Sequence, residues 1–397
     1  MKPDYRLLAV MYVSQYLGLS FFTDGLVAIL RDRGASLEQI GTFETLGLIW
    51  VAKPLWATFV DRIGTYRGWL LVLQPTLAAV LLLAIPLDPV RDLGVLAAVV
   101  AVVAFLSASH DIATDAIAVR MLAENQRGIG SGIQTAGGYL GGILGGGLTL
   151  LVYDHFGWSA AIVTLAVTTV LPLLQIARFR EPAALPAVHR PSVRAVLRRP
   201  GALRWMLLVM PPCIIGLYGG YALITPMLVD LGWSVTSVGL TTNALGGLVG
   251  IGFGIGVGLL AARFRRRAVL VAAACAQVLA LVLMASAWFT GSSVAVLVAA
   301  MTVQAAMAAT MTIVFTIAID RAEKTSAGTD FTVVASFLML LGTIGGALLT
   351  TIAGAVGYVT ALTGAAVVAV VGAVGAARNF QESSSDVVAE PVVVRQA

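Results

Sequence analysis

Long apolar segments constrain the fold of this chain more than any other feature of its sequence. Each is about 20 residues long, which is the length a helix needs to cross the hydrocarbon core of a bilayer. They lie at 7–30, 36–60, 68–87, 93–119, 128–153, 157–177, 203–229, 234–261, 268–289, 292–319, 328–353 and 357–377. The sequence therefore predicts an all-α membrane protein with twelve transmembrane helices.

The composition excludes a soluble protein. Only 11% of the 397 residues are charged, whereas 59% are hydrophobic, and that is too little charge to cover a soluble surface of this size. Both cysteines, Cys213 and Cys275, fall within apolar windows, so we expect neither a disulfide nor a metal site. The net charge of +5 follows membrane topology and does not indicate a nucleic-acid partner.

The distribution of Lys and Arg predicts the orientation of the chain. With a cytoplasmic amino terminus, all of the 25 Lys and Arg residues fall on the cytoplasmic side except Arg31, Arg33, Lys53 and Arg91. Positive residues concentrate in cytoplasmic loops. We therefore expect a multi-pass protein of the cytoplasmic (inner) membrane with both termini in the cytoplasm.

The two halves of the sequence repeat one another. Adding 200 to a position maps Gly128, Gly142 and Gly145 onto Gly328, Gly342 and Gly345, and permeases built from parallel halves bind substrate between them near the bilayer midplane. We expect a six-helix half at 1–178, a basic cytoplasmic linker at 179–202, a second six-helix half at 203–378 and a disordered cytoplasmic tail at 379–397.

The segment LSASHDIATDAIAVR places acids inside an apolar helix. Counting back from Arg120 by helical rise puts Asp111 roughly 13 Å deep, and ionisable groups at such depth are functional candidates. Asp111 and Asp115 are four residues apart and share one helical face, so we expect this helix to line a cavity, with the adjacent His110 able to share a proton. The alternative is a polar cluster that only orients the helix.

Lys53 is also buried in an apolar window, together with Glu44. A buried ammonium needs an acidic partner or loses its proton, and the depth of Lys53 matches the interval between Asp111 and Asp115. We therefore predict that Lys53 pairs with one of these two acids.

Polar and aromatic side chains elsewhere in the apolar windows are candidates for substrate binding. They are Gln15, Phe22, Asp24, Gln134, Tyr139, Tyr218, Tyr221, Asn243 and Gln304. Each could instead make an interhelical contact. Because the second half is aromatic and poor in charge, we expect a bulky, partly apolar substrate, with ion chemistry confined to the first half. The Gly-rich segment 128–147 predicts close packing of gating helices, since small residues let helix backbones approach in lipid.

The segment WATFVDRIGTYRG at 56–68 resembles the signature loop between helices two and three of the major facilitator superfamily. The resemblance implies that Asp61, Arg62 and Arg67 form an inner gate, in which the acid caps a helix terminus of the other half. The second half offers GLLAARFRRR at 258–267, which keeps the arginines and loses the acid.

Two further motifs narrow the resemblance. KPLWATFVDR together with SASHDIATDA resembles the muropeptide permease and acetyl-CoA transporter branch of that superfamily. Within the branch, GASLEQIG at 34–41 and SAGTDFT at 326–332 are most similar to inner-membrane importers of siderophores of the pyochelin and rhizobactin type. His110 and Ile117 depart from the branch pattern, and we expect both to line the cavity.

These observations predict a secondary active transporter that works by alternating access. The expected activity is proton-coupled import of a siderophore or a similar small molecule by a monomer in the lipid bilayer, with the proton gradient as energy source and no cofactor. The alternatives are a muropeptide permease, a drug or metabolite efflux pump, and, in a different class, a membrane receptor that does not transport. No catalytic constellation is visible, so an enzyme is not expected.

Overall fold

The computed structural model describes residues 4–36, 39–40, 45–182, 191–290 and 292–380. Helices account for nearly all of this part of the chain. The first half contains α1 (Tyr5–Ser20), η1 (Phe21–Gly25), α2 (Leu26–Asp32), η2 (Thr45–Gly47), α4 (Leu48–Ala52), α5 (Pro54–Arg62), α6 (Tyr66–Leu82), α7 (Leu93–Met121), η3 (Glu124–Gln126), α8 (Arg127–Gly142), η4 (Ile143–Leu148), α9 (Thr149–Val170) and α10 (Leu173–Arg178).

The remainder begins with α11 (Val193–Arg198) in the segment that joins the halves. The second half contains α12 (Ala202–Arg204), η5 (Trp205–Val209), α13 (Met210–Ala222), α14 (Ile224–Asp230), α15 (Val235–Gly239), η6 (Leu240–Leu245), α16 (Gly246–Arg263), α17 (Arg266–Thr290), α18 (Ser293–Arg321), α19 (Ala327–Val356) and α20 (Tyr358–Asn379).

These helices make twelve membrane crossings within the described residues, as predicted. Eight continuous helical stretches are long and apolar enough to cross a membrane. One of them, 124–178, turns at Gly157, where φ is 80°, and so supplies two crossings. The remaining three crossings are α1 with α2, α4 with α5, and α6, each of which is shorter or broken.

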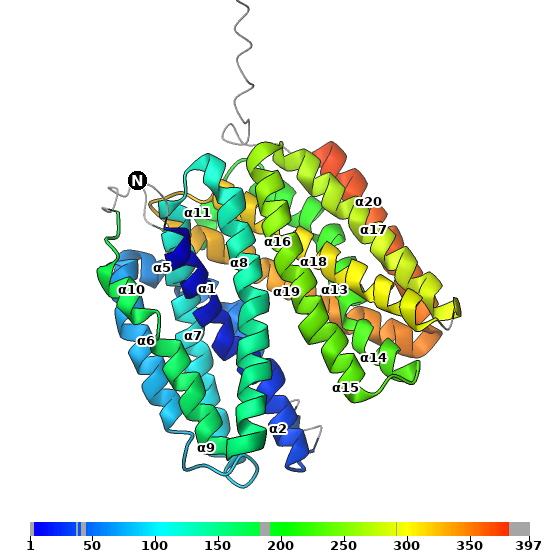
Figure 1. Cartoon of the computed structure of the whole chain (residues 1–397). Helices are drawn as coiled ribbons and strands as arrows, with labels where there is room; N and C mark the ends of the chain where they lie inside the picture. Colours follow the sequence, from blue (N-terminus) through cyan, green and yellow to red (C-terminus); the bar gives the residue numbers. More distant parts are fainter. Residues whose placement is uncertain (1–3, 37–38, 41–44, 183–190, 291, 381–397) are drawn as a thin grey trace, which may run out of the picture.

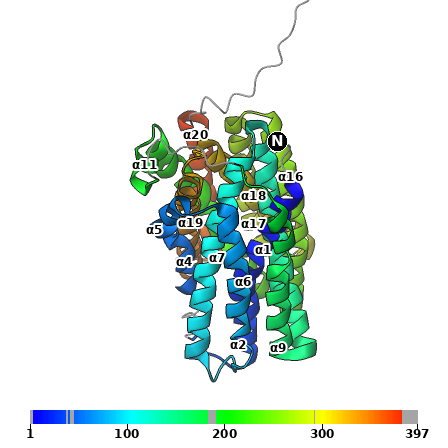
Figure 2. The same cartoon turned by 90° about the vertical axis from the view of Figure 1, so that its left-hand side faces the viewer.

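The helices form two bundles that lean against each other (Figure 1). Both views place α11 and the amino terminus at one end, and α2 and α9 at the opposite end (Figures 1 and 2). We call these the linker end and the distal end. In Figure 1 the bundles approach at the linker end, where α8 and α16 run side by side, and diverge toward the distal end.

Glycines allow the close approach at the linker end. A Cβ atom at Gly128 of α8 would lie 2.6 Å from the carbonyl oxygen of Gly258 in α16, and one at Gly132 would lie 2.8 Å from that of Gly254. Such distances are too short for any side chain larger than hydrogen. The close packing predicted for this Gly-rich segment is therefore confirmed, and it joins the two halves directly.

Both cysteines are free. Cys213 is buried and Cys275 is exposed on the surface of the helical bundle. Within the described residues, no group of three or more His, Cys, Asp or Glu side chains is arranged to hold a metal ion.

Candidate functional site: a central cavity with a buried ion pair

A cavity of about 360 Å³ lies between the two halves. Its lining comes from α1, α4, the junction of α4 and α5, α7, α8 and η4 of the first half, and from α13, η6, α16, α18 and α19 of the second. Among the described residues, the charged side chains that line it are Lys53, Asp111 and Asp115, and all three belong to the first half. The cavity therefore has a charged wall and an uncharged wall.

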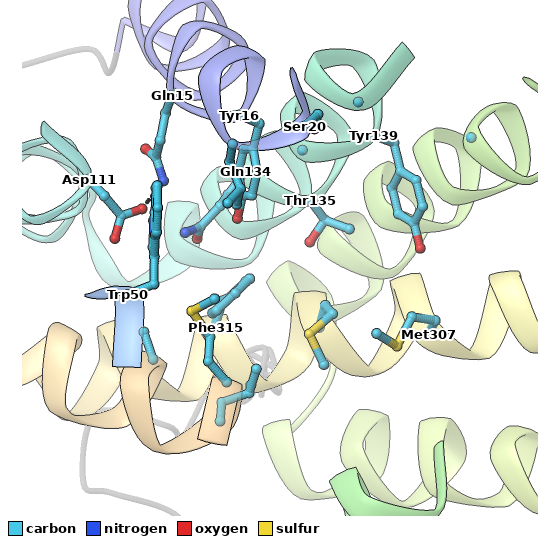
Figure 3. A pocket seen from close by; sticks show the side chains of 18 of the residues that line it. Gln15, Tyr16, Ser20, Trp50, Asp111, Gln134, Thr135, Tyr139, Met307 and Phe315 are labelled. Atoms are coloured by element: carbon cyan, nitrogen blue, oxygen red, sulfur yellow. Dashed lines mark hydrogen bonds between the residues drawn. The ribbon is translucent and has the colours of Figure 1, made fainter. Parts of the chain in front are cut away.

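Lys53 lies at the junction of α4 and α5 and forms an ion pair with Asp111 of α7. Both side chains are buried, with 3% and 8% of their surfaces exposed. Gln15 of α1 donates a second hydrogen bond to the Asp111 carboxylate, and Figure 3 shows the amide group of Gln15 next to that carboxylate. Asp111 is thus held by a cation and by an amide from two different helices.

Asp115 lies one helical turn further along α7 and has different partners. Gln134 of α8 donates to its Oδ1 at 3.0 Å, and the Tyr12 hydroxyl also hydrogen-bonds this carboxyl. Of the two acids considered for Lys53, the structure brings Asp111 into the ion pair and leaves Asp115 with neutral partners.

The uncharged wall is built from sulfur and aromatic groups. Among the described residues, this wall contains Tyr218, Tyr221, Met307, Met311, Phe315, Phe331 and Met339. Figure 3 shows Met307 and Phe315 on one helix, opposite Gln134 and Thr135. Methionine and aromatic side chains form adaptable apolar surfaces, so this wall suits the apolar face of a ligand whose polar groups meet the opposite wall.

Six of the nine side chains predicted to bind substrate line the cavity. Gln15, Gln134, Tyr139, Tyr218, Tyr221 and Asn243 line it. Phe22 packs edge-on against Phe21 in the first half, with ring centroids 5.3 Å apart, and Gln304 donates to the Thr242 carbonyl at 3.1 Å. Neither lines the cavity. The side chain of Asp24 and the whole of Glu44 lie outside the described part of the chain.

His110 and Ile117 do not line the cavity, contrary to expectation. His110 turns into the first half, where its Nε2 lies 3.2 Å from Gln74 Nε2 and its Nδ1 lies 3.4 Å from Thr114 Oγ1. Ile117 is 1% exposed and belongs to the apolar core. Helical geometry explains both placements, because successive residues differ by about 100° in direction and only the face of Asp111 and Asp115 points to the cavity.

Sequence reasoning missed several lining residues. Tyr16, Ser20, Trp50 and Thr135 contribute from the first half. Their residue types are common in transmembrane helices, and no local pattern distinguishes a cavity face from a helix contact. Only the packing of the two halves identifies them.

The linker end is closed by contacts between the halves. Asp61 at the end of α5 accepts hydrogen bonds from the backbone N–H groups of Gly328 and Thr329 at 3.0 and 2.8 Å, and from the Thr329 hydroxyl at 2.6 Å. It therefore lies at the N-terminus of α19, where the helix dipole favours a negative charge.

Arg62 and Arg67, in contrast, contact the linker and the end of the first half. Arg62 donates to the Pro191 carbonyl at 2.8 Å. Arg67 donates to the carbonyls of Ile176 and Ala177 at 3.0 and 2.7 Å. Of the three residues predicted to form the gate, only Asp61 has a side chain that hydrogen-bonds to the other half within the described part of the chain.

A second acid, Asp320, also joins the two halves. Asp320 of α18 pairs with Arg127 of α8 at 3.0 Å and with Arg266 of α17 at 2.8 Å. Arg266 lies in the second-half segment that lacks an acid of its own. The acid that pairs with Arg266 therefore comes from another helix, α18, and the local sequence around Arg266 does not indicate this partner.

The sequence and the fold are both similar to those of known proteins. Residues 8–346 match the family model described as Major Facilitator Superfamily. The chain is 34% identical over 164 residues to the anhydromuropeptide permease of Escherichia coli (strain K12), a match that covers 40% of this chain and 33% of the relative. The match thus spans only a third of the length of that curated relative.

Two solved structures share the fold. The human organic anion transporter MFSD10 (TETRAN) superposes with a TM-score of 0.73 at 15% identity, covering 94% of this chain and 100% of the other. The transporter FucP in the outward conformation also gives a TM-score of 0.73, at 16% identity, covering 95% and 99%. With the family match extending over most of the sequence, the chain belongs to the Major Facilitator Superfamily and is a multi-pass membrane protein.

Proposed function

We propose that this transporter imports a muropeptide-like solute across the cytoplasmic membrane, in symport with protons. The observation that carries the proposal is the Lys53–Asp111 ion pair on the wall of the central cavity. The similarity to an anhydromuropeptide permease supports the muropeptide class over the siderophore class that the shorter motifs favoured.

The chemistry of the two walls suits such a solute. A muropeptide joins amino sugars to a short peptide, so it carries carboxylates at one end and apolar sugar faces and acetyl groups at the other. The carboxylates match Lys53, which is the cation among the lining residues, and the sugar faces match the aromatic and methionine wall. Aromatic side chains present flat apolar surfaces of this kind.

The ion pair offers a direct route to coupling. In the observed state Lys53 and Asp111 neutralise each other, and a buried charge without its partner is costly. Protonation of Asp111 would release Lys53 to bind a substrate carboxylate, and binding of the carboxylate would in turn favour the protonated acid. Proton and substrate would then occupy the cavity together, which is the requirement for symport.

We infer the conformational state from the proposed orientation. If the linker end faces the cytoplasm, as the distribution of Lys and Arg predicts, the contacts of Asp61 and Asp320 close the cytoplasmic side. The protein is then in an outward-facing or occluded state, ready to receive a solute from the periplasmic side. Import requires that these contacts break.

Transport into proteoliposomes tests the proposal. Labelled anhydromuropeptide should accumulate when a pH gradient with an acidic exterior is imposed, and Lys53→Met should abolish accumulation. Lys324→Met is the matched control, because Lys324 is exposed and only its backbone carbonyl is used, as acceptor for Arg120. Accumulation of a labelled ferric siderophore, with none of the muropeptide, would reject the substrate class and retain the transporter.

A further inference from the structure

A second, much smaller pocket lies inside the first half, behind the charged wall of the central cavity. Its volume is about 10 Å³. Its polar lining consists of Ser14, Gln15, Gln74, Ser107, His110 and Thr169, from α1, α6, α7 and α9. Gln15 lines both this pocket and the central cavity, so its side chain separates the two spaces.

The hydrogen bonds of Gln74 leave its carbonyl oxygen without a donor. Its amide nitrogen lies 3.4 Å from Ser14 Oγ and 3.2 Å from His110 Nε2. An amide NH₂ group has two hydrogens, so these contacts use both when His110 is the tautomer whose Nε2 accepts. Gln74 is fully buried, and its Oε1 has no hydrogen-bond partner among the described residues.

Gln15 has the same deficit. Its amide nitrogen donates to Asp111, while its Oε1 is buried and has no partner in the described part of the chain. A buried carbonyl that accepts no hydrogen bond is unfavourable. Two amide oxygens that each require a donor therefore belong to residues that line one small pocket.

We propose that this pocket is a single-water site, in which one water donates a hydrogen to Gln15 Oε1 and the other to Gln74 Oε1. A volume of about 10 Å³ is close to what one water molecule needs, and buried waters typically make about three hydrogen bonds to such groups. No charged side chain is among the described residues that line the pocket, so the site favours a neutral molecule with two donors over an ion.

The water has a consequence for the central cavity. Held through its carbonyl, the Gln15 amide presents its NH₂ group to Asp111, the acid that pairs with Lys53. Gln74 is then a positioning residue, which acts on Asp111 through the water and Gln15 without touching the cavity. The inference concerns the same charged wall as the proposed function, but the water site does not depend on which solute is carried.

Structure determination of the unmodified protein at a resolution that shows ordered waters tests the site directly. We expect one density peak within about 2.7–3.2 Å of both amide oxygens, and its loss in a Gln74→Leu variant. An empty pocket would overturn the proposal. A peak with six oxygen neighbours at shorter distances would identify a cation and would overturn it as well.

A double-mutant cycle provides an independent measurement. If Gln15 and Gln74 share one water, the losses of thermal stability in Gln15→Leu and Gln74→Leu should be non-additive in the double variant, because residues of one network couple. Gln277 is the control, since it is buried in the second half and its Oε1 also lacks a partner; Gln15→Leu with Gln277→Leu should be additive. Additive losses for Gln15 and Gln74 would contradict a shared water.

Neither measurement requires transport, so failure of the water site and failure of the proposed function are distinguishable. If the leucine variants do not fold, the density of the unmodified protein still decides between an occupied and an empty site.

Discussion

The carboxylate of Asp61 accepts a hydrogen bond from the backbone N–H of Thr329 at 2.8 Å, although 268 residues separate the two in the chain. The contact joins the end of α5 in the first half to the first turn of α19 in the second. Opening of the linker end must break it. We therefore expect Asp61 to contribute to the equilibrium between the two access states.

Asp61→Asn should weaken the closed linker end. A carboxylate at a helix N-terminus contributes about 0.3–1 kcal/mol, and up to about 2 kcal/mol when partly buried, which corresponds to a severalfold to roughly thirtyfold shift between two states. Ser131→Cys is a suitable reporter, because Ser131 is fully buried on α8 and its hydroxyl has no partner among the described residues.

The measurement is the rate of thiol labelling in inside-out vesicles, with Cys213 and Cys275 first replaced. Labelling of the cysteine at position 131 should be faster in the Asp61→Asn background. Equal rates in both backgrounds, with transport retained, would show that the closed state depends on other contacts, such as those of Asp320.

Lys53→Ala should lower the stability of the folded protein as well as its transport. Loss of one member of a buried ion pair leaves the other charge uncompensated, at a cost of about 3–5 kcal/mol. Combining Lys53→Ala with Asp111→Asn should restore part of the thermal stability in detergent, whereas combining it with Asp115→Asn should not, because Lys53 pairs with Asp111 and not with Asp115. Equal recovery in both double variants would contradict the observed pairing.

Asp111→Asn should separate transport from its energy source. If Asp111 carries the coupled proton, the variant cannot accumulate solute against a gradient, while exchange of labelled for unlabelled solute across the membrane continues. Asp154→Asn is the control, because that carboxylate is 82% exposed and should leave both activities unchanged. Uphill accumulation by well-folded Asp111→Asn would assign coupling to another group.

Gly128→Ala should destabilise the closed linker end through a backbone clash. The added methyl group would lie 2.6 Å from the Gly258 carbonyl, so α8 and α16 would have to separate. Gly147→Ala is the control, because nothing lies within 4 Å of its Cβ position and alanine is more favourable than glycine in a helix by about 0.5–1 kcal/mol. Faster labelling of the cysteine at position 131 in Gly128→Ala alone is the expected outcome; equal rates in the two variants would refute it.

Much of the fold was predictable from the sequence because the bilayer limits the possibilities. Windows of about 20 apolar residues can cross it only as helices when they are not part of a barrel, and the repeat at an offset of 200 predicts two related halves. The depth of Lys53 matches the depth of Asp111 and Asp115, so a pair between Lys53 and one of these acids could also be predicted. Helical rise relates sequence position to depth.

The choice between candidate partners at similar depth in the membrane required the tertiary structure. Depth alone could not decide whether Lys53 pairs with Asp111 or Asp115, because the answer depends on how α4 and α7 rotate about their axes. The rotation of α7 also turns His110 away from the cavity, and that of α1 directs Gln15 toward it. The partnership of Asp320 with Arg127 and Arg266 likewise joins three helices whose order in the sequence does not indicate contact.

The sequence by itself determined the class of protein, the number of crossings and the acids buried in the membrane, because hydrophobicity and helical rise are local properties of the chain. The tertiary structure alone decided which face of each helix meets the other half. Side chains of the same type and at the same depth in the membrane can line the cavity, pack in the core or join the two halves. Which of these they do depends on the packing of helices that lie far apart in the sequence.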